Sequence, residues 1–210
     1  MTTKQRYALF IAHFSQAMPD AATELHFSTT FELLCAVMLS AQCTDKRVNL
    51  VTPQLFASYP TAQALAAATA DDVYQIIRSV SYPNSKAAHL VAMAKQLVDQ
   101  HSGQVPSTLE ALTALPGVGR KTANVVLSVA FGQPRMPVDT HVFRVSHRIG
   151  LVPPRCTTPL SVEQELIKHL PTDIIPLAHH WLILHGRYVC KSLSPQCTTC
   201  PISTFCKHAL

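Results

Sequence analysis

The residues best suited to chemistry are a glycine turn, a lysine and a carboxylate that lie close together in the chain. The turn spans 115–119 and contains Gly117 and Gly119, and Lys121 lies two residues after Gly119. The two glycines permit backbone conformations that side chains would forbid, so their N–H groups can converge on an oxyanion. A helix expected over about 120–131 directs its positive end toward the same point. Phosphate is therefore the natural ligand of this turn.

Lys121 and Asp139 could supply covalent chemistry beside such a phosphate site. The dipole of the expected helix disfavours a positive charge on Lys121, which increases the fraction of free amine available as a nucleophile. Asp139 stands in the segment Val138-Asp139-Thr140-His141 and could stabilise a developing cation. Each residue also has an ordinary explanation. Lysines are usually solvated, and aspartate is a favoured N-cap for a helix that begins near position 140.

Four of the seven cysteines crowd the C-terminal end in the pattern C-x6-C-x2-C-x5-C. Four thiolates in one short loop can surround one metal centre. Structural zinc usually takes two tight C-x2-C pairs, whereas this loop has one tight pair and two wide gaps, which suit a bulkier cluster. Disulfides are disfavoured because nothing marks the chain as secreted. The residues of this loop are Cys190, Cys197, Cys200 and Cys206.

Composition indicates a compact protein that can bind nucleic acid through a local patch. Of the 210 residues, 48% are hydrophobic and 14% are charged, and the formal net charge is +5. This charge permits DNA binding but does not argue for it alone. The apolar run 7–14 is too short to span a bilayer and has helical spacing, so it reads as a packed helix and not as a signal peptide. We expect a cytoplasmic protein with no membrane contact.

Helical patterns cover almost the whole chain. Capping boxes are expected at Thr29–Glu32 and at Ser107–Glu110, and no segment sustains the alternation of a strand. The sequence therefore predicts an all-α fold. Besides the helices at 7–14, 30–39 and 120–131, helical segments are expected over 45–56, 61–67, 71–80, 84–101, 139–149, 161–170 and 173–185.

The segments LPGVGRKTANVVL at 115–127 and VDTHVFRV at 138–145 resemble the helix-hairpin-helix and Gly-Pro-Asp region of DNA glycosylases, specifically the endonuclease III family. The cysteine loop also matches the [4Fe–4S] loop of that family. The resemblance extends over 27–206 and implies a two-domain helix-hairpin-helix glycosylase fold. A six-helix domain would span 23–134, with the helix-hairpin-helix at about 107–131. A cluster domain would combine 1–22 with 135–210.

The same resemblance implies an activity and a cofactor. The protein would be a bifunctional DNA glycosylase and abasic-site lyase acting on oxidised pyrimidines. Lys121 would form a Schiff base with the sugar, and Asp139 would assist departure of the base. One [4Fe–4S] cluster per chain would be held by the four C-terminal cysteines. Its partner would be damaged double-stranded DNA, bound by a monomer.

Several further residues match DNA-facing positions of the family. Gln42, in the segment Ser40-Ala41-Gln42-Cys43-Thr44-Asp45, would fill the space left by a flipped base. Tyr82 is a candidate wedge in the loop 81–86, where Tyr82-Pro83 departs from the family pattern of an aliphatic or aromatic residue followed by tyrosine. The hairpin would grip a phosphate through Leu115, Gly117, Val118 and Gly119, and Arg187 and Lys191 are candidate phosphate contacts.

Two other functions share part of this pattern. The cluster-bearing adenine glycosylase that acts on mispairs lacks the Schiff-base lysine and carries a glutamate where this chain has Ala36. It also has a further C-terminal recognition domain. A non-catalytic DNA-binding iron–sulfur module would need the hairpin and the cysteines only. Lys121 and Ala36 together disfavour the adenine glycosylase, and the presence of both Lys121 and Asp139 disfavours the non-catalytic module.

Overall fold

The computed structural model describes residues 1–209, and within them the chain forms eleven α-helices, one 3-10 turn and no strand. This confirms the all-α prediction. The chain divides into two compact units, which we call the inserted unit (Glu24–Phe131) and the terminal unit (Met1–Thr23 with Gly132–Leu210). The expected end of the second domain at residue 210 lies outside the described residues. No helix within 1–209 is both long enough and apolar enough to cross a membrane.

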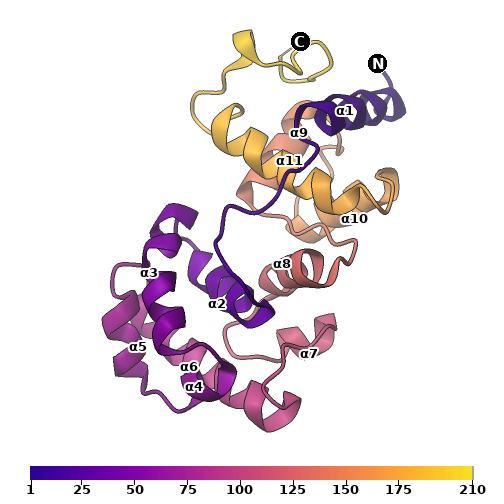
Figure 1. Ribbon diagram of the computed structural model, residues 1–210. Helices are drawn as coiled ribbons and strands as arrows, with labels where there is room; N and C mark the ends of the chain where they lie inside the picture. Colours follow the sequence, from indigo (N-terminus) through magenta and orange to yellow (C-terminus); the bar gives the residue numbers. More distant parts are fainter. Residues whose placement is uncertain (210) are drawn as a thin grey trace. The chain divides into compact units, whose positions relative to one another are not determined.

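The inserted unit is built around α2, which is buried along nearly its whole length. The helix packs against α3, α6 and α8, and it lies beside α3 and α8 in Figure 1. Its residues Leu33, Leu34 and Leu39 are fully buried in the core of this unit. The helices of the unit are α2 (Thr30–Ser40), α3 (Asp45–Ser58), α4 (Ala62–Ala66), α5 (Ala70–Ile77), α6 (Pro83–His101), α7 (Leu109–Thr113) and α8 (Arg120–Phe131).

The terminal unit has a separate aromatic core. The rings of Phe10 and Phe14 lie 5.8 and 5.9 Å from the ring of Trp181, and the Trp181 indole N–H donates to the Met18 carbonyl at 2.7 Å. These contacts hold the first helix against α11. The helical elements of this unit are α1 (Thr3–Ala17), α9 (Thr140–Ile149), α10 (Pro159–His169), α11 (Ile175–Tyr188) and the 3-10 turn η1 (Cys197–Thr199).

Both expected capping boxes differ in detail from the structure. The Thr29 hydroxyl does accept the Glu32 N–H at 3.2 Å, but the Glu32 carboxylate accepts from the N–H of Ser28 at 2.6 Å instead of from that of Thr29. The cap of α7 is Thr108, one residue later than expected, and it accepts the Ala111 N–H at 3.3 Å. Ser107 and Thr108 are both good caps, so the sequence could not choose between them.

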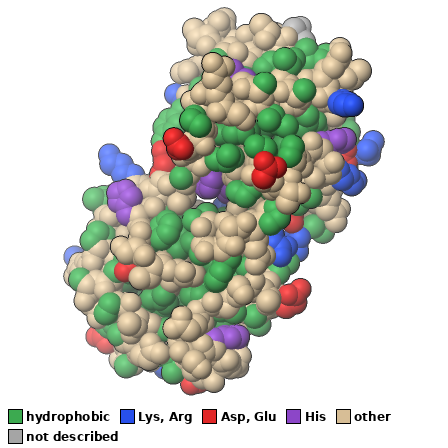
Figure 2. Space-filling view, turned by 45° about the vertical axis from the view of Figure 1, so that its right-hand side comes forward, with side chains coloured by type: hydrophobic (Ala, Val, Ile, Leu, Met, Phe, Trp, Pro, Cys, Tyr) green, Lys and Arg blue, Asp and Glu red, His purple; other side chains and the backbone are tan. Residues whose placement is uncertain are grey.

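Basic side chains form no continuous tract on the surface shown in Figure 2, where they lie singly or in small groups among hydrophobic and polar atoms. This agrees with a chain in which only 14% of residues are charged. Attraction of a polyanion to this face would therefore depend on local sites.

Candidate functional site

The hairpin between α7 and α8 is anchored by its apolar side chains. Leu115 and Val118 are buried, with 2% and 5% of their surfaces exposed, and the Val118 N–H closes the turn on the Leu115 carbonyl at 3.1 Å. The glycines between and after them, Gly117 and Gly119, are exposed. The turn therefore presents backbone to the outside while its side chains fix it to the core.

The two glycines of the hairpin differ in backbone conformation and in the space around them. Gly117 has a φ of +76°, and a Cβ placed there would lie 2.8 Å from the Cβ of His89 and 3.0 Å from the Cε of Met38. Gly119 has no positive φ, and no heavy atom lies within 4 Å of a Cβ built at that position. The expectation that Gly119 adopts a conformation forbidden to other residues is therefore wrong. The open space at Gly119 faces outward, where a ligand could approach the backbone.

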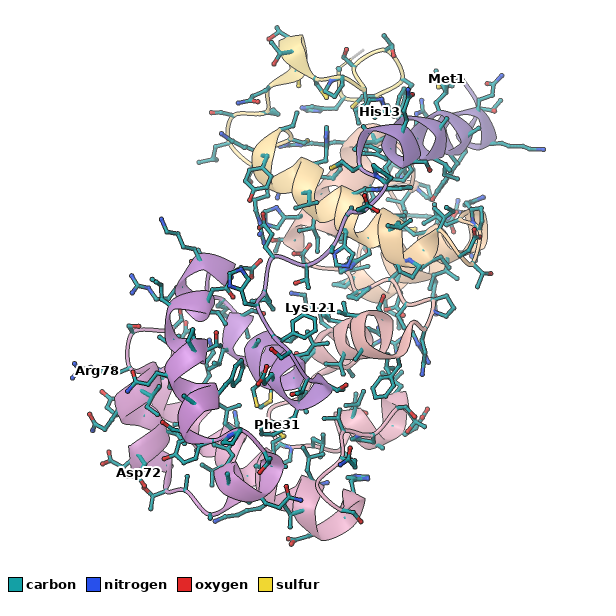
Figure 3. All side chains as sticks on the ribbon, in the orientation of Figure 1. Met1, His13, Phe31, Asp72, Arg78 and Lys121 are labelled. Carbon is teal, nitrogen blue, oxygen red and sulfur yellow. The ribbon has the colours of Figure 1, made fainter. Side chains whose placement is uncertain are left out.

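Lys121 lies in the first turn of α8, directly after the hairpin, and its side chain is exposed (Figure 3). Within residues 1–209 its amine has neither a hydrogen-bond acceptor nor an ionic partner. The amine is thus not engaged by the protein and is available to an external reactant.

Asp139 is the N-cap of α9 in the terminal unit. Its Oδ1 accepts the Val142 N–H at 2.8 Å, and the residues before it, Met136, Pro137 and Val138, are buried. The capping role weighed for Asp139 is therefore present. It engages Oδ1, and the second oxygen has no protein donor among the described residues.

Gln42 and Tyr82 are brought together with Gly117 around one pocket of about 220 Å³ in the inserted unit. Both have left-handed backbones, with φ of 53° at Gln42 and 54° at Tyr82, and the Tyr82 side chain is 65% exposed. Both proposed DNA-inserting residues and part of the proposed phosphate hairpin thus border the same pocket.

Lys86 also lines this pocket, although its place in the sequence did not mark it as a site residue. It is only 9% exposed, and its amine donates to the carbonyls of Leu39 at 2.8 Å and Ala41 at 2.7 Å. Burial lowers the pKa of the Lys86 amine from its usual range. One signal could have found it: Lys86 lies in helical register with the buried Leu90 and Leu97, on the apolar stripe of α6.

The four C-terminal cysteines line a single pocket at the end of α11, and all of them are free thiols. Burial raises the pKa of the Cys200 thiol, whose Sγ lies 3.7 Å from His185 Nε2. Within residues 1–209 no three metal-ligating side chains converge on a single ion. Four thiols that border one pocket could together hold a metal centre.

Arg148 connects α9 with this cysteine loop. Its guanidinium donates to the carbonyls of Lys191 at 2.7 Å and Ser192 at 2.8 Å, and it lies 3.6 Å from the sulfur of Cys190. The Lys191 side chain is exposed, and Arg187 is half-buried. Of the two expected phosphate contacts, Lys191 is thus the more accessible.

Comparisons with known proteins bear on this arrangement. A family model described as the HhH-GPD superfamily base excision DNA repair protein matches residues 35–172. The chain is 48% identical to the endonuclease III of Rickettsia conorii over 195 aligned residues, and the alignment covers 93% of this chain and 92% of that protein. It is 45% identical over 190 residues to the endonuclease III of Escherichia coli K12, which covers 90% of this chain and 89% of that protein.

Solved structures agree with these relatives. A trapped endonuclease III–DNA covalent intermediate matches with a TM-score of 0.93 and 44% identity, over 100% of this chain and 98% of that one. A thermostable thymine-DNA glycosylase matches with a TM-score of 0.88 at 19% identity, over 99% of this chain and 98% of that one, which shows a shared fold alone. The chain therefore belongs to the HhH-GPD superfamily of base excision DNA repair proteins and, within it, to the endonuclease III family.

Proposed function

We propose that the protein is a bifunctional DNA glycosylase and abasic-site lyase that removes oxidised pyrimidines from duplex DNA. The observation that carries this proposal is the exposed Lys121 amine, which has no protein partner within residues 1–209 and directly follows the glycine hairpin. The solved structure of a trapped endonuclease III–DNA covalent intermediate supports it, because this chain is 44% identical to that enzyme over its whole length.

The hairpin would hold the DNA without reading its sequence. Backbone N–H groups near Gly117 and Gly119 would bind a phosphate at the positive end of α8, which fixes the register of the strand. Lys191 and Arg187 would add phosphate contacts from the terminal unit. Gln42 and Tyr82 would enter the base stack as the damaged nucleotide leaves it.

Lys121 would then act as the nucleophile. Its neutral amine attacks C1′, a nitrogen–carbon bond forms, and the bond from C1′ to the damaged base breaks. Ring opening of the sugar gives an imine between Lys121 and C1′. Loss of a proton from C2′ allows the C3′–oxygen bond to break, which cuts the strand on the 3′ side, and water releases the enzyme. Asp139 would stabilise the cationic sugar through its negative charge.

The cysteine loop would hold one [4Fe–4S] cluster through Cys190, Cys197, Cys200 and Cys206. Four thiols around one pocket support this assignment. When bound, the cluster would supply structural order to the loop that carries Lys191, since neither base excision nor elimination is a redox step. We also propose that the inserted unit is the six-helix domain, that the terminal unit is the cluster domain, and that the protein acts as a cytoplasmic monomer.

The mispair-specific adenine glycosylase is not favoured. Ala36 is fully buried on α2 and offers no carboxylate at the position where that enzyme carries its glutamate. Lys121 would also have no covalent task in such an enzyme.

Borohydride trapping tests the proposal directly, because it reduces an imine to a stable protein–DNA adduct. Duplexes containing thymine glycol or an abasic site would be incubated with the wild type, with Lys121→Gln and with the control Lys95→Gln. The control removes a different exposed lysine, which lies on α6. The wild type and the control should give the adduct and cut the strand. Lys121→Gln should still bind DNA but lose both reactions. Undiminished trapping in Lys121→Gln would place the nucleophile elsewhere and refute the proposed mechanism.

A further inference from the structure

Two proposed DNA-inserting residues have backbones that their side chains disfavour. Gln42 and Tyr82 are left-handed, and the only other such non-glycine residue within 1–209 is Ser102, the C-cap of α6. In this region Cβ approaches the backbone carbonyl oxygen closely. Such conformations persist only when their surroundings hold them. The question is therefore which contacts hold Gln42 and Tyr82.

Two of these contacts come from the Lys86 side chain, whose amine donates to the carbonyls of Leu39 at 2.8 Å and Ala41 at 2.7 Å. The backbone N–H of Lys86 also donates to the Tyr82 carbonyl at 3.1 Å, but this is the first hydrogen bond of α6 and does not depend on the side chain. A further contact comes from the loop before α6, where the Ser81 hydroxyl donates to the Gln42 carbonyl at 2.7 Å. The segment after α2 and the segment before α6 are thus joined through Lys86 and Ser81.

These bonds fix both peptide groups that flank Gln42. The Ala41 carbonyl belongs to the peptide group before Gln42, and the Gln42 carbonyl belongs to the group after it. Rotation about φ and ψ of Gln42 changes the relative orientation of these two groups. Lys86 holds the first group and Ser81 holds the second, so the left-handed conformation of Gln42 cannot relax without breaking one of the two hydrogen bonds.

A side chain that only capped α2 would not need both hydrogen bonds that the Lys86 amine donates. Lysine near a helix C-terminus commonly satisfies the last carbonyls, and the bond to Leu39 does this for α2. The bond to Ala41 lies beyond the last residue of the helix and acts on the insertion loop itself. Lys86 is also only 9% exposed, and its bond to the Leu39 carbonyl is buried while its bond to the Ala41 carbonyl is partly buried.

We propose that Lys86 is a positioning residue whose amine holds Gln42 in the conformation in which it enters the base stack. This inference rests on the proposed function, because it assumes that Gln42 fills the space left by an extruded nucleotide. Lys86 itself touches neither the sugar nor the base.

The test compares two substrates that differ in their need for insertion. The first is a duplex with thymine glycol opposite adenine and 2-aminopurine beside the lesion, whose fluorescence reports opening of the stack. The second is an abasic site in single-stranded DNA, which has no stack to enter. The variants are Lys86→Met, which removes the amine but keeps an unbranched side chain, and Ser81→Ala. Lys95→Met, on the exposed face of the same helix, controls for loss of one charge.

Lys86→Met should slow both the fluorescence change and single-turnover excision in the duplex by about tenfold or more, since hydrogen bonds to a charged group make large contributions. Ser81→Ala should slow the same steps by roughly threefold, because it removes one neutral hydrogen bond. Borohydride trapping on the single strand should stay within about twofold of the wild type for both variants, and the control should change neither reaction.

Other outcomes refute the inference. Equal loss on the two substrates would show general damage to the fold, and an unchanged duplex rate would show that insertion does not depend on these bonds. If Lys86→Met fails to fold, Ser81→Ala decides the question, through the ratio of its excision rate on the duplex to its trapping rate on the single strand. Failure of the wild type to form an adduct on the single strand would instead contradict the proposed lyase activity.

Discussion

Alanine substitutions at Gly117 and Gly119 should separate folding of the hairpin from its contact with DNA. At Gly117 the new side chain meets a left-handed backbone with φ of +76° and a Cβ–Cβ distance of 2.8 Å to His89. Left-handed strain of about 1–2 kcal/mol and overpacking of about 1–3 kcal/mol predict that Gly117→Ala lowers the free energy of unfolding by roughly 2–5 kcal/mol. Gly119→Ala meets no atom within 4 Å, so its effect should stay within about 1 kcal/mol and can be stabilising.

Urea unfolding followed by circular dichroism measures the stability of each variant, and fluorescence anisotropy with a labelled duplex measures DNA affinity. Gly119→Ala should bind damaged and undamaged duplexes several-fold more weakly, since a methyl group would keep a phosphate from the backbone. The dependence of affinity on salt should remain, because no cationic side chain is removed. Unaltered affinity in Gly119→Ala would refute the phosphate cradle. Loss of affinity for one lesion alone would show that the hairpin reads the base.

Three further predictions concern the terminal unit. Asp139→Asn should preserve the cap that Asp139 provides to Val142 but slow base excision by roughly 100-fold, because the negative charge is lost, and it should affect cleavage of preformed abasic sites less. Asp139→Ala should in addition lower the free energy of unfolding by about 1 kcal/mol, because the cap is lost. Single-turnover kinetics and urea unfolding distinguish the two variants. The wild type should contain close to four iron and four acid-labile sulfide per chain, as about one cubane requires, and Cys197→Ser should lose them, whereas stoichiometric zinc without iron would contradict the cluster. Burial lowers the pKa of the His180 imidazole to about 4, so below pH 6.5 the unfolded chain takes up a proton that the folded protein does not. The free energy of unfolding should therefore fall by up to about 3 kcal/mol as the pH drops from 6.5 to about 4. Urea unfolding of His180→Gln should show a flatter pH dependence.

Much of the fold was predictable because helix signals are local. The range expected for α8 agrees with the structure, since the glycine turn before it and the segment Gly132-Gln133-Pro134 after it are strong start and stop signals. The beginning of α10 was expected at Ser161 but lies at Pro159, where Thr158 provides the cap and Ser161 completes the capping box. Several residues near this start could serve as caps, and only the folded chain selects one.

Site residues that belong to a sequence motif were predictable, whereas those whose part in the site depends on burial were not. Membership of the endonuclease III family, predicted from the hairpin and the cysteine spacing, is confirmed. The role of Lys86 was missed, because a lysine in the first turn of a helix normally lies in solvent and its two acceptors are more than 40 residues away in the chain. The space around Gly119 likewise depends on tertiary packing that no spacing reveals.

The division of the chain into an inserted and a terminal unit has a consequence for the order in which the protein folds during synthesis. Residues Glu24–Phe131 contain the whole inserted unit, so it can fold as soon as this stretch has left the ribosome. Helix α1 is made first but is completed last, because Arg6 donates to the carbonyl of Phe205 across 199 residues and Trp181 donates to that of Met18 across 163. Until α10 and α11 have been made, its apolar face, with Tyr7, Phe10 and Phe14, lacks the aromatic partners His169 and Trp181 that it has in the folded unit. Slow translation of the final third of the chain would therefore prolong the exposure of this face to chaperones and proteases.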